Sequence, residues 1–154
     1  MIEIREADPA CDLPIVEQLF REYAQSLDVD LCFQNFEQEL SSLPDKYAQP
    51  LGRLILAWNE TRPIGCVALR PIDGDICEMK RLYVQPLARG HQLGRQLVQR
   101  ICREAKDAGY RRICLDTLPS MSTAIQLYES MGFKAIGAYV FNPVQGALFF
   151  GLDL

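Results

Sequence analysis

The chain has 154 residues, of which 49% are hydrophobic and 23% charged, and its net charge is −4. A chain of this length folds as one domain that buries roughly 70% of its unfolded surface, so we expect a single domain over residues 1–154. No apolar run approaches the ~18 residues of a membrane span and no signal-peptide pattern is present, which excludes a membrane partner and predicts a cytoplasmic location.

Cysteine and charge patterns narrow the function classes further. Six cysteines and one histidine are scattered without a C-x-x-C pair, which argues against a zinc site and, without an export signal, against a disulfide framework. Residues 80–112 carry nine Lys or Arg and two Asp or Glu, whereas residues 1–45 carry two Lys or Arg and eleven Asp or Glu. Two readings stay open: two solvated faces, or a basic cofactor region opposite an acidic region that attracts a cation. No basic–aromatic stripe occurs, so we expect no nucleic-acid partner.

The first half of the chain predicts two helices and a hairpin. Ile2 and Ile4 alternate with charged residues, as in a short edge strand. Asp12 is the expected cap of a helix whose apolar residues recur at helical spacing through Leu27. A shorter helix is expected from about residue 33 to 43, before Pro44. The apolar runs 53–58 and 64–69 predict a β-hairpin.

The second half alternates strands and helices. After a turn at Asp73-Gly74 we expect a strand ending at Val84, and Gly109 and Gly132 end two helices. The remaining expected elements are a helix from about residue 93, a strand at 112–115, a helix at 120–131, and strands at 133–137 and 147–152. The order β-α-α-β-β-β-α-β-α-β-β predicts an α/β fold with a mixed sheet covered by helices.

A loop between the strand ending at Val84 and the next helix predicts an anion site. It reads Arg89-Gly90-His91-Gln92-Leu93-Gly94-Arg95. The first turn of a helix leaves backbone N–H groups unpaired, and the helix dipole adds partial positive charge there. Phosphate is the usual ligand of such a site.

Three segments together resemble the GCN5-related N-acetyltransferase (GNAT) superfamily. They are EMKRLYV at 78–84, RGHQLG at 89–94 and LYESMGF at 127–133, in the family's order and spacing. The resemblance implies a mostly antiparallel mixed sheet flanked by helices. It also implies transfer of an acyl group, usually acetyl, from coenzyme A to an amine by direct attack, without a metal.

The resemblance also assigns the cofactor site. The loop would hold the pyrophosphate of coenzyme A through backbone N–H groups, and the strand at Leu82 and Val84 would pair with the pantetheine arm, as a peptide adds to a strand edge. The expected cofactor-binding residues are Leu82, Tyr83, Val84, Arg89, Gly90, His91, Gln92, Leu93, Gly94, Arg95, Met121, Ala124 and Tyr128. Two positions depart from the family: Gln92 replaces a glycine, and Met121 replaces an asparagine.

Glu78 is the expected catalytic base. In an alternating strand it shares a face with Lys80, Leu82 and Val84, and it resembles a family position that often carries a base glutamate. The proton could pass directly or through water. The alternative is an exposed strand carboxylate paired with a basic neighbour. By the same resemblance, the Leu82 N–H is the expected oxyanion donor.

Tyr128 resembles the family tyrosine near the cofactor sulfur, so we expect it to protonate or position the thiol; its alternative is a core position. His91 lies in the phosphate loop and is expected to face solvent or phosphate rather than to act in catalysis. Asp116 and Thr117 end a strand, where a helix cap or turn is the expected use and ligand binding the alternative. The stretch Tyr139, Phe141, Asn142 and Pro143 could line the acceptor pocket or serve the turn and core.

The sequence does not identify the acceptor. The acidic first third favours a small cationic amine, and a peptide amine is a further candidate, with specificity placed in residues 27–47 and 139–146. A homodimer is common in the family. Two rival functions are a non-catalytic acyl-CoA sensor and a nucleotide-binding protein. The second is weakened because neither G-x-x-x-x-G-K-[ST] nor G-x-G-x-x-G occurs.

Overall fold

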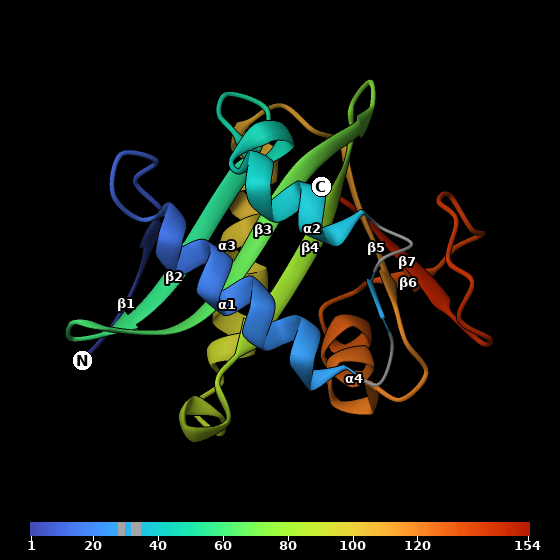
Figure 1. The fold of residues 1–154 in the computed structure, drawn as a ribbon. Helices are drawn as coiled ribbons and strands as arrows, with labels where there is room; N and C mark the ends of the chain where they lie inside the picture. The colour runs from blue at the N-terminus through green and yellow to red at the C-terminus, as the bar shows by residue number, and fades with distance from the viewer. Residues whose placement is uncertain (28–29, 32–34) are drawn as a thin grey trace.

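A computed structural model describes residues 1–27, 30–31 and 35–154 (Figure 1). One seven-stranded sheet has the order β1-β2-β3-β4-β5-β7-β6. The strands are β1 (Ile2–Glu6), β2 (Arg53–Asn59), β3 (Arg62–Asp73), β4 (Ile76–Val84), β5 (Arg112–Thr117), β6 (Lys134–Ala135) and β7 (Leu148–Asp153). Neighbouring strands are antiparallel except β4 and β5, which are parallel. The predicted mixed, mostly antiparallel sheet is therefore confirmed.

The helices cover both faces of the sheet. They are α1 (Leu13–Ser26), α2 (Phe36–Ser42), α3 (Leu93–Asp107) and α4 (Ser122–Ser130), with short 3-10 turns η2 (Asp45–Tyr47) and η3 (Pro86–Ala88). In Figure 1, α1 and α2 lie across one face, α3 crosses the other, and α4 stands near β5. The predicted element order is confirmed. Cys32 and the expected start of the second helix at residue 33 lie outside the described residues.

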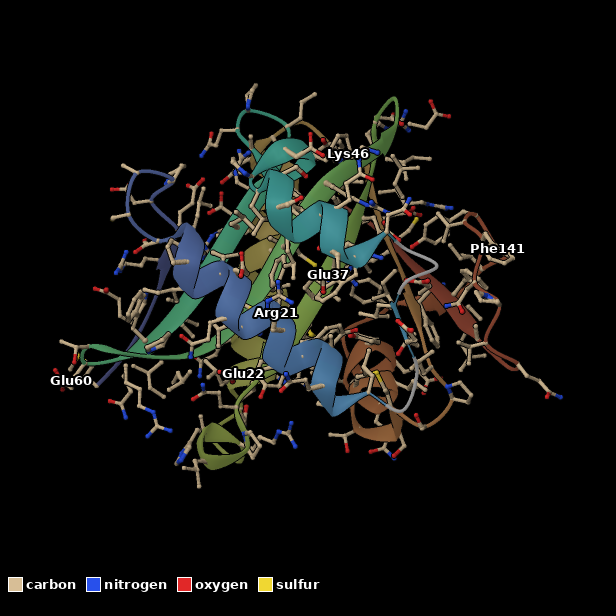
Figure 2. The ribbon with its side chains drawn as sticks, viewed as in Figure 1. Arg21, Glu22, Glu37, Lys46, Glu60 and Phe141 are labelled. Carbon is tan, nitrogen blue, oxygen red and sulfur yellow. The ribbon has the colours of Figure 1, made fainter. Side chains whose placement is uncertain are left out.

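Each face has its own apolar core. Helix α3 buries one stripe at helical spacing, Leu93, Leu97, Val98, Ile101 and Ala105, against β3 and β4. Each fully buried leucine or isoleucine contributes roughly 1.5–3 kcal/mol. On the other face α1 buries Val16, Leu19 and Phe20. Figure 2 shows Arg21 of α1 pointing toward Glu37 of α2, and the two side chains make a two-pronged ion pair at 3.0 and 3.2 Å.

The start of α1 differs from the prediction in one detail. Asp12 stands at the N-cap position, but its side chain makes no capping hydrogen bond. Its carboxylate instead accepts hydrogen bonds from the Asp8 backbone N–H at 2.8 Å and from Arg5 at 3.3 Å. The expected side-chain cap is therefore wrong, because the preceding loop and β1 occupy this carboxylate.

A bulge in β4 reverses the faces of the strand. Ala68 of β3 lies opposite Lys80, and Cys66 lies opposite Tyr83, so a single β3 residue between them faces two β4 residues. Arg81, one of those two, has a positive φ of 61°. Such a bulge shifts the side-chain alternation by one residue. Leu82 and Val84 therefore pack on the α3 side with Met79. The predicted common face for Glu78, Leu82 and Val84 is wrong.

Strands β4 and β5 part soon after they meet. Their residue pairs are Ile76–Arg112, Cys77–Ile113 and Glu78–Cys114, and among the described residues none follows. The part of β4 from Met79 to Val84 keeps β3 as its neighbour and leaves its other edge open. The open edge forms one wall of the candidate site.

Several boundaries shift by one to three residues. Helix α4 begins at Ser122 rather than 120, and β6 is limited to Lys134–Ala135 within the expected 133–137. Only these two β6 residues pair with β7, since the chain then leaves the sheet as a long loop from 136 to 147. This loop returns to the site described next.

Candidate functional site

A groove with a volume of about 680 Å³ runs between the open edge of β4, the loop before α3 and the start of α4. The structure brings eleven of the thirteen predicted cofactor-binding residues to this groove. They are Leu82, Tyr83, Val84, Arg89, Gly90, Gln92, Leu93, Gly94, Arg95, Met121 and Ala124. Segments about 40 residues apart in sequence thus form one continuous surface.

The N-terminus of α3 opens onto the groove. Gln92 is the N-cap residue in the left-handed conformation, with φ 55°, and no side chain caps this end. The first-turn N–H groups therefore lack partners within the helix and are available to an anion that enters the groove. The positive φ explains why a glycine suits the position of Gln92, because a side chain is strained there.

Two arginines flank this end of the groove and are held by neutral partners. Arg89 donates through Nε to the Val84 carbonyl at 3.1 Å, and Arg95 donates to the Ser130 hydroxyl at 2.7 Å. Both guanidinium groups keep further N–H donors and their full charge. The groove thus has the positive charge and the amide donors that a pyrophosphate requires.

Two predicted cofactor-binding residues lie elsewhere. His91 lines a separate cavity beside Met1 and Arg62, on the far side of the loop. Tyr128 lines a second, narrow pocket of about 40 Å³ that adjoins the groove. Tyr23, Leu82 and Met121 line both the groove and the narrow pocket, so the two spaces meet at these side chains.

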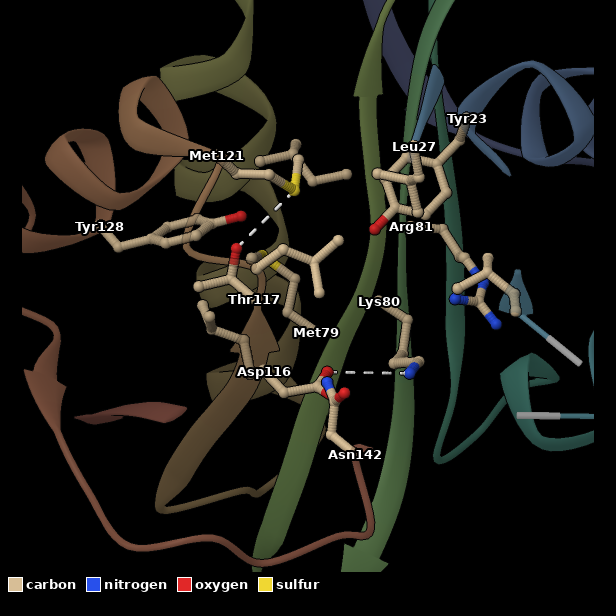
Figure 3. Close-up of a pocket in the computed structure, with 14 residues that line it drawn as sticks. Tyr23, Leu27, Met79, Lys80, Arg81, Asp116, Thr117, Met121, Tyr128 and Asn142 are labelled. Carbon is tan, nitrogen blue, oxygen red and sulfur yellow. Dashed lines mark hydrogen bonds and ion pairs between the residues drawn. The ribbon is translucent and has the colours of Figure 1, made fainter. Parts of the chain in front are cut away.

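Tyr128 is both a core residue and a pocket residue. Its ring packs against Phe133 and Phe150, and the residue is 5% exposed. Burial raises the pKa of its hydroxyl, which therefore stays protonated. In Figure 3 the hydroxyl points toward Thr117 and Met121, at the end of the pocket nearest the groove.

The far end of the narrow pocket carries a charged cluster. Lys80 Nζ lies 4.0 Å from Asp116 Oδ1, and the Asn142 amide donates to Asp116 Oδ2 at 3.1 Å (Figure 3). All three side chains line the pocket. Lys80 is only 7% exposed, and burial lowers its pKa below the ordinary lysine value.

The sequence pattern does not predict this cluster, since it relates Lys80 only to Glu78 on the same strand. The expected helix cap at Asp116 and Thr117 is wrong, because no side chain caps α4. Both residues end β5 and line the pocket. In the long loop from 136 to 147, Asn142 lines the pocket, whereas Phe141 is 75% exposed at the outer edge of the molecule (Figure 2).

Glu78 lies two residues before Lys80 on β4 and is 0% exposed. Oε1 makes a 2.7 Å ion pair with Arg70, and Oε2 accepts a 2.6 Å hydrogen bond from the Tyr139 hydroxyl. Burial and the neighbouring Glu78 raise the pKa of Tyr139. The pairing of Glu78 with a basic neighbour is found, but the carboxylate is not exposed, and neither the groove nor the narrow pocket includes it.

Two classes of site are not seen in the described part of the chain. No group of three or more His, Cys, Asp or Glu side chains is placed to hold a metal ion among residues 1–27, 30–31 and 35–154. Within those same ranges no helix has the length and apolar character of a membrane span.

Comparisons with known proteins agree with this geometry. Residues 14–133 match the model of the acetyltransferase (GNAT) family. An uncharacterized N-acetyltransferase of Schizosaccharomyces pombe is 40% identical over 145 residues, covering 93% of this chain and 89% of the relative.

Solved structures share the fold over almost the whole chain. An acetyltransferase of Streptococcus agalactiae superposes with a TM-score of 0.80 at 25% identity, covering 99% of this chain and 98% of the other. The acetyltransferase yncA of Salmonella typhimurium, solved with its cofactor acetyl-CoA, has a TM-score of 0.70 at 20% identity, covering 99% and 93%. The chain therefore belongs to the acetyltransferase (GNAT) family.

Proposed function

We propose that this protein is an acetyl-CoA-dependent N-acetyltransferase that binds its acyl donor in the groove and its amine acceptor in the narrow pocket. One observation carries the proposal: the groove and the pocket meet at Tyr23, Leu82 and Met121. A long donor and a small acceptor would reach the same point from opposite sides. Proximity of this kind converts a bimolecular reaction into an effectively unimolecular one.

The groove suits the parts of coenzyme A. The unpaired amides at the start of α3, with Arg89 and Arg95 beside them, would hold the pyrophosphate. The open edge of β4 at Leu82 and Val84 offers backbone groups to an extended, amide-bearing arm. When bound, the donor supplies a thioester, which is the activated form of the acetyl group.

The residues at the junction, where the groove and the narrow pocket meet, would then promote the acetyl transfer. The Leu82 N–H would stabilise the oxyanion that forms when an amine attacks the thioester directly. Tyr128 would return a proton to the departing thiolate, since its hydroxyl stays protonated and lies at the junction end of the pocket. Glu78 would order the pocket through Arg70 and Tyr139, because both of its oxygens already have partners.

An acceptor screen tests this function. Thiol release from acetyl-CoA is followed with polyamines, amino acids, aminoglycosides and peptides, at matched concentrations, together with CoA affinity by titration calorimetry. We expect turnover with at least one primary amine, and a fall in kcat of at least tenfold in Tyr128→Phe with unchanged CoA affinity. CoA binding without turnover across the whole panel would favour the acyl-CoA sensor instead. Thermal stabilisation of the protein by ATP but not by CoA would favour a nucleotide-binding protein.

The acceptor and the cellular location belong to this proposal as well. The narrow pocket favours an unhindered primary amine over a bulky secondary one, because its volume is about 40 Å³. A small cationic amine remains the preferred class, since Asp116 offers a carboxylate to an ammonium group. Cell fractionation tests the cytoplasmic location.

A further inference from the structure

Lys80, at the far end of the narrow pocket beside Asp116, has no part in the mechanism given above. We propose that Lys80, paired with Asp116, accepts the proton of the acceptor's ammonium group, in place of Glu78. This inference rests on the proposed function, because it assigns the proton acceptor of that same reaction.

Access separates the two candidate bases. Lys80 and Asp116 both line the pocket, whereas Glu78 is 0% exposed and does not line it. Both oxygens of Glu78 are engaged, by Arg70 at 2.7 Å and by Tyr139 at 2.6 Å. A base must come within hydrogen-bond reach of the proton that it takes, directly or through one water. Lys80 and Asp116 line the pocket in which the amine would bind, and Glu78 does not line it, so Lys80 is the better placed of the two candidate bases.

The bulge in β4 puts Lys80 near the reaction junction. Lys80 lies two residues before Leu82 on the same strand, and the two residues line the same pocket although they belong to opposite faces of the sheet. The strands β4 and β5 have already parted at this level, so Lys80 of β4 reaches across the gap toward Asp116 of β5. An amine in this gap would lie between the junction and the Lys80–Asp116 pair.

The surroundings of Lys80 lower its pKa. Burial is the main effect and lowers its pKa, as do the positive charges of Arg81 and Arg70, while Glu78 and Asp116 raise it. Arg81 is matched by Glu39 through two hydrogen bonds of 3.0 Å, and Arg70 by Glu78. A lysine whose pKa lies below its ordinary value loses its proton more readily and so suits the role of a general base better. Asp116, fixed by Asn142, stabilises the ammonium that Lys80 forms.

The proposed step balances. One N–H bond of the acceptor ammonium breaks and its proton goes to the lone pair of Lys80 Nζ. The freed amine forms a C–N bond with the thioester carbon, and the C–S bond breaks as the tetrahedral intermediate collapses. Tyr128 protonates the sulfur and regains a proton from the second N–H of the new amide nitrogen. Lys80 releases its proton to solvent, so the products are the N-acetylamine, the CoA thiol and one proton.

Two substitutions of Lys80 distinguish a role as a base from a role as a fixed positive charge. Lys80→Arg keeps the charge but cannot deprotonate, and Lys80→Met removes both. We expect kcat to fall at least tenfold in both variants and in Asp116→Asn, with CoA affinity by calorimetry within twofold of wild type. The exposed Lys106→Arg is the matched control and is expected to keep the wild-type kcat. Retention of kcat in Lys80→Arg, or a fall in Glu78→Gln but not in the Lys80 variants, would overturn the inference.

The pH profile of kcat adds a readout that a purely structural role would not move. At saturating amine the acidic limb reports a group in the bound complex. We expect the fall of kcat at low pH to occur at the same pH for two acceptors whose amines differ in pKa. We also expect this fall to be absent from the residual activity of Lys80→Met. A limb that follows the acceptor's own pKa would contradict a role for Lys80.

Proton binding by Lys80 can be measured without turnover. NMR of protein labelled with ¹³C-lysine, titrated between pH 6 and 11, is assigned with Lys80→Arg. We expect Lys80 to titrate below Lys46, Lys106 and Lys134, and lower still in Asp116→Asn, because a negative neighbour is lost. Titration together with the other three lysines would overturn the inference. Absence of wild-type turnover with every acceptor would instead refute the proposed function.

Discussion

The Tyr139 hydroxyl donates a 2.6 Å hydrogen bond to Oε2 of the fully buried Glu78. Tyr139 belongs to the long loop between β6 and β7, and Asn142 of the same loop binds Asp116. Two carboxylates on neighbouring strands, which part at this level, thus hold one loop against the narrow pocket. The loop is a fixed wall of the pocket, and its attachment can be tested residue by residue.

Tyr139→Phe leaves Oε2 of Glu78 buried without its hydrogen-bond donor. We expect a loss of about 1–3 kcal/mol in unfolding free energy, the usual cost of an unsatisfied buried acceptor. We also expect KM for the amine to rise while CoA affinity is unchanged, because the loop borders only the narrow pocket. Urea unfolding and steady-state kinetics measure the two effects. Phe141→Leu, on the exposed part of the same loop, serves as the control; an equal effect there would point to general loosening of the loop.

Arg95→Gln removes a positive charge from the phosphate end of the groove while keeping a side chain that can reach Ser130. A charge-assisted hydrogen bond contributes about 1.5–3 kcal/mol, so we expect the Kd for CoA to rise roughly 10- to 100-fold. Titration calorimetry at two salt concentrations gives the affinity and its electrostatic part. Arg103→Gln, exposed farther along α3, is the matched control. Equal losses in both variants would attribute the effect to overall charge.

Gln92→Gly relieves the strain of a left-handed residue at the start of α3. The relief is about 1–2 kcal/mol, and the greater chain entropy of glycine offsets about 0.5–1 kcal/mol of it. We expect a net gain of about 0.5–1 kcal/mol, seen as a higher Tm by calorimetry. Gln92→Ala keeps the strained backbone and is expected to gain nothing. A gain in the alanine variant equal to that in the glycine variant would show that the amide, not the backbone, is unfavourable.

Met121→Asn supplies a cap that α4 lacks. Met121 is the N-cap residue and no side chain caps the helix. Asparagine is among the best N-cap residues, so we expect a gain of about 1 kcal/mol by chemical unfolding. Met121→Leu keeps an apolar side chain of similar size without a cap and isolates the effect. Because Met121 also lines the groove, CoA affinity is measured for both; an asparagine that binds CoA more tightly than leucine would support its expected role as a polar contact.

Lys80 also gives stability a pH dependence of known sign. Its pKa is lowered in the folded state by burial, from an ordinary value of 10.5. Between the folded and unfolded pKa values the unfolded chain binds more protons, so this residue makes stability rise with pH in that window. Buried cysteines such as Cys66, whose thiol pKa is raised by burial, act in the opposite direction. Wild type and Lys80→Met share these cysteines, so their difference isolates the effect of Lys80. We expect the unfolding free energy, measured from pH 8 to 10, to have a more positive slope against pH in wild type than in Lys80→Met.

Much of the fold could be predicted because its signals are local. Helix α3 buries its apolar stripe with a 3.6-residue period, and Gly109 follows its end at a positive φ of 97°. The loop before α3 is recognisable from its glycines and arginines, which lie around the start of the apolar stripe of the helix. These features depend on residues within a few positions of one another, so the sequence pattern contains them.

The acceptor end of the site could not be predicted in the same way. The bulge at Arg81 moves Leu82 and Val84 to the other face, whereas a strict two-residue alternation keeps them beside Glu78. The Lys80–Asp116–Asn142 cluster joins a strand, the next parallel strand and a distant loop, and no local pattern relates them. A buried lysine also has no sequence signature of its own, because its burial depends on what the tertiary fold places over it.

The early parting of β4 and β5 has a consequence for the protein outside catalysis. Four strands on one side and three on the other are joined at only three residue pairs, and the β4 edge beyond them is open among the described residues. Open strand edges are where chains pair with one another and aggregate. A ligand that fills the groove would cover the part of this edge at Leu82 and Val84. A bound ligand is therefore expected to lower any tendency of this edge to pair with a second copy of the chain.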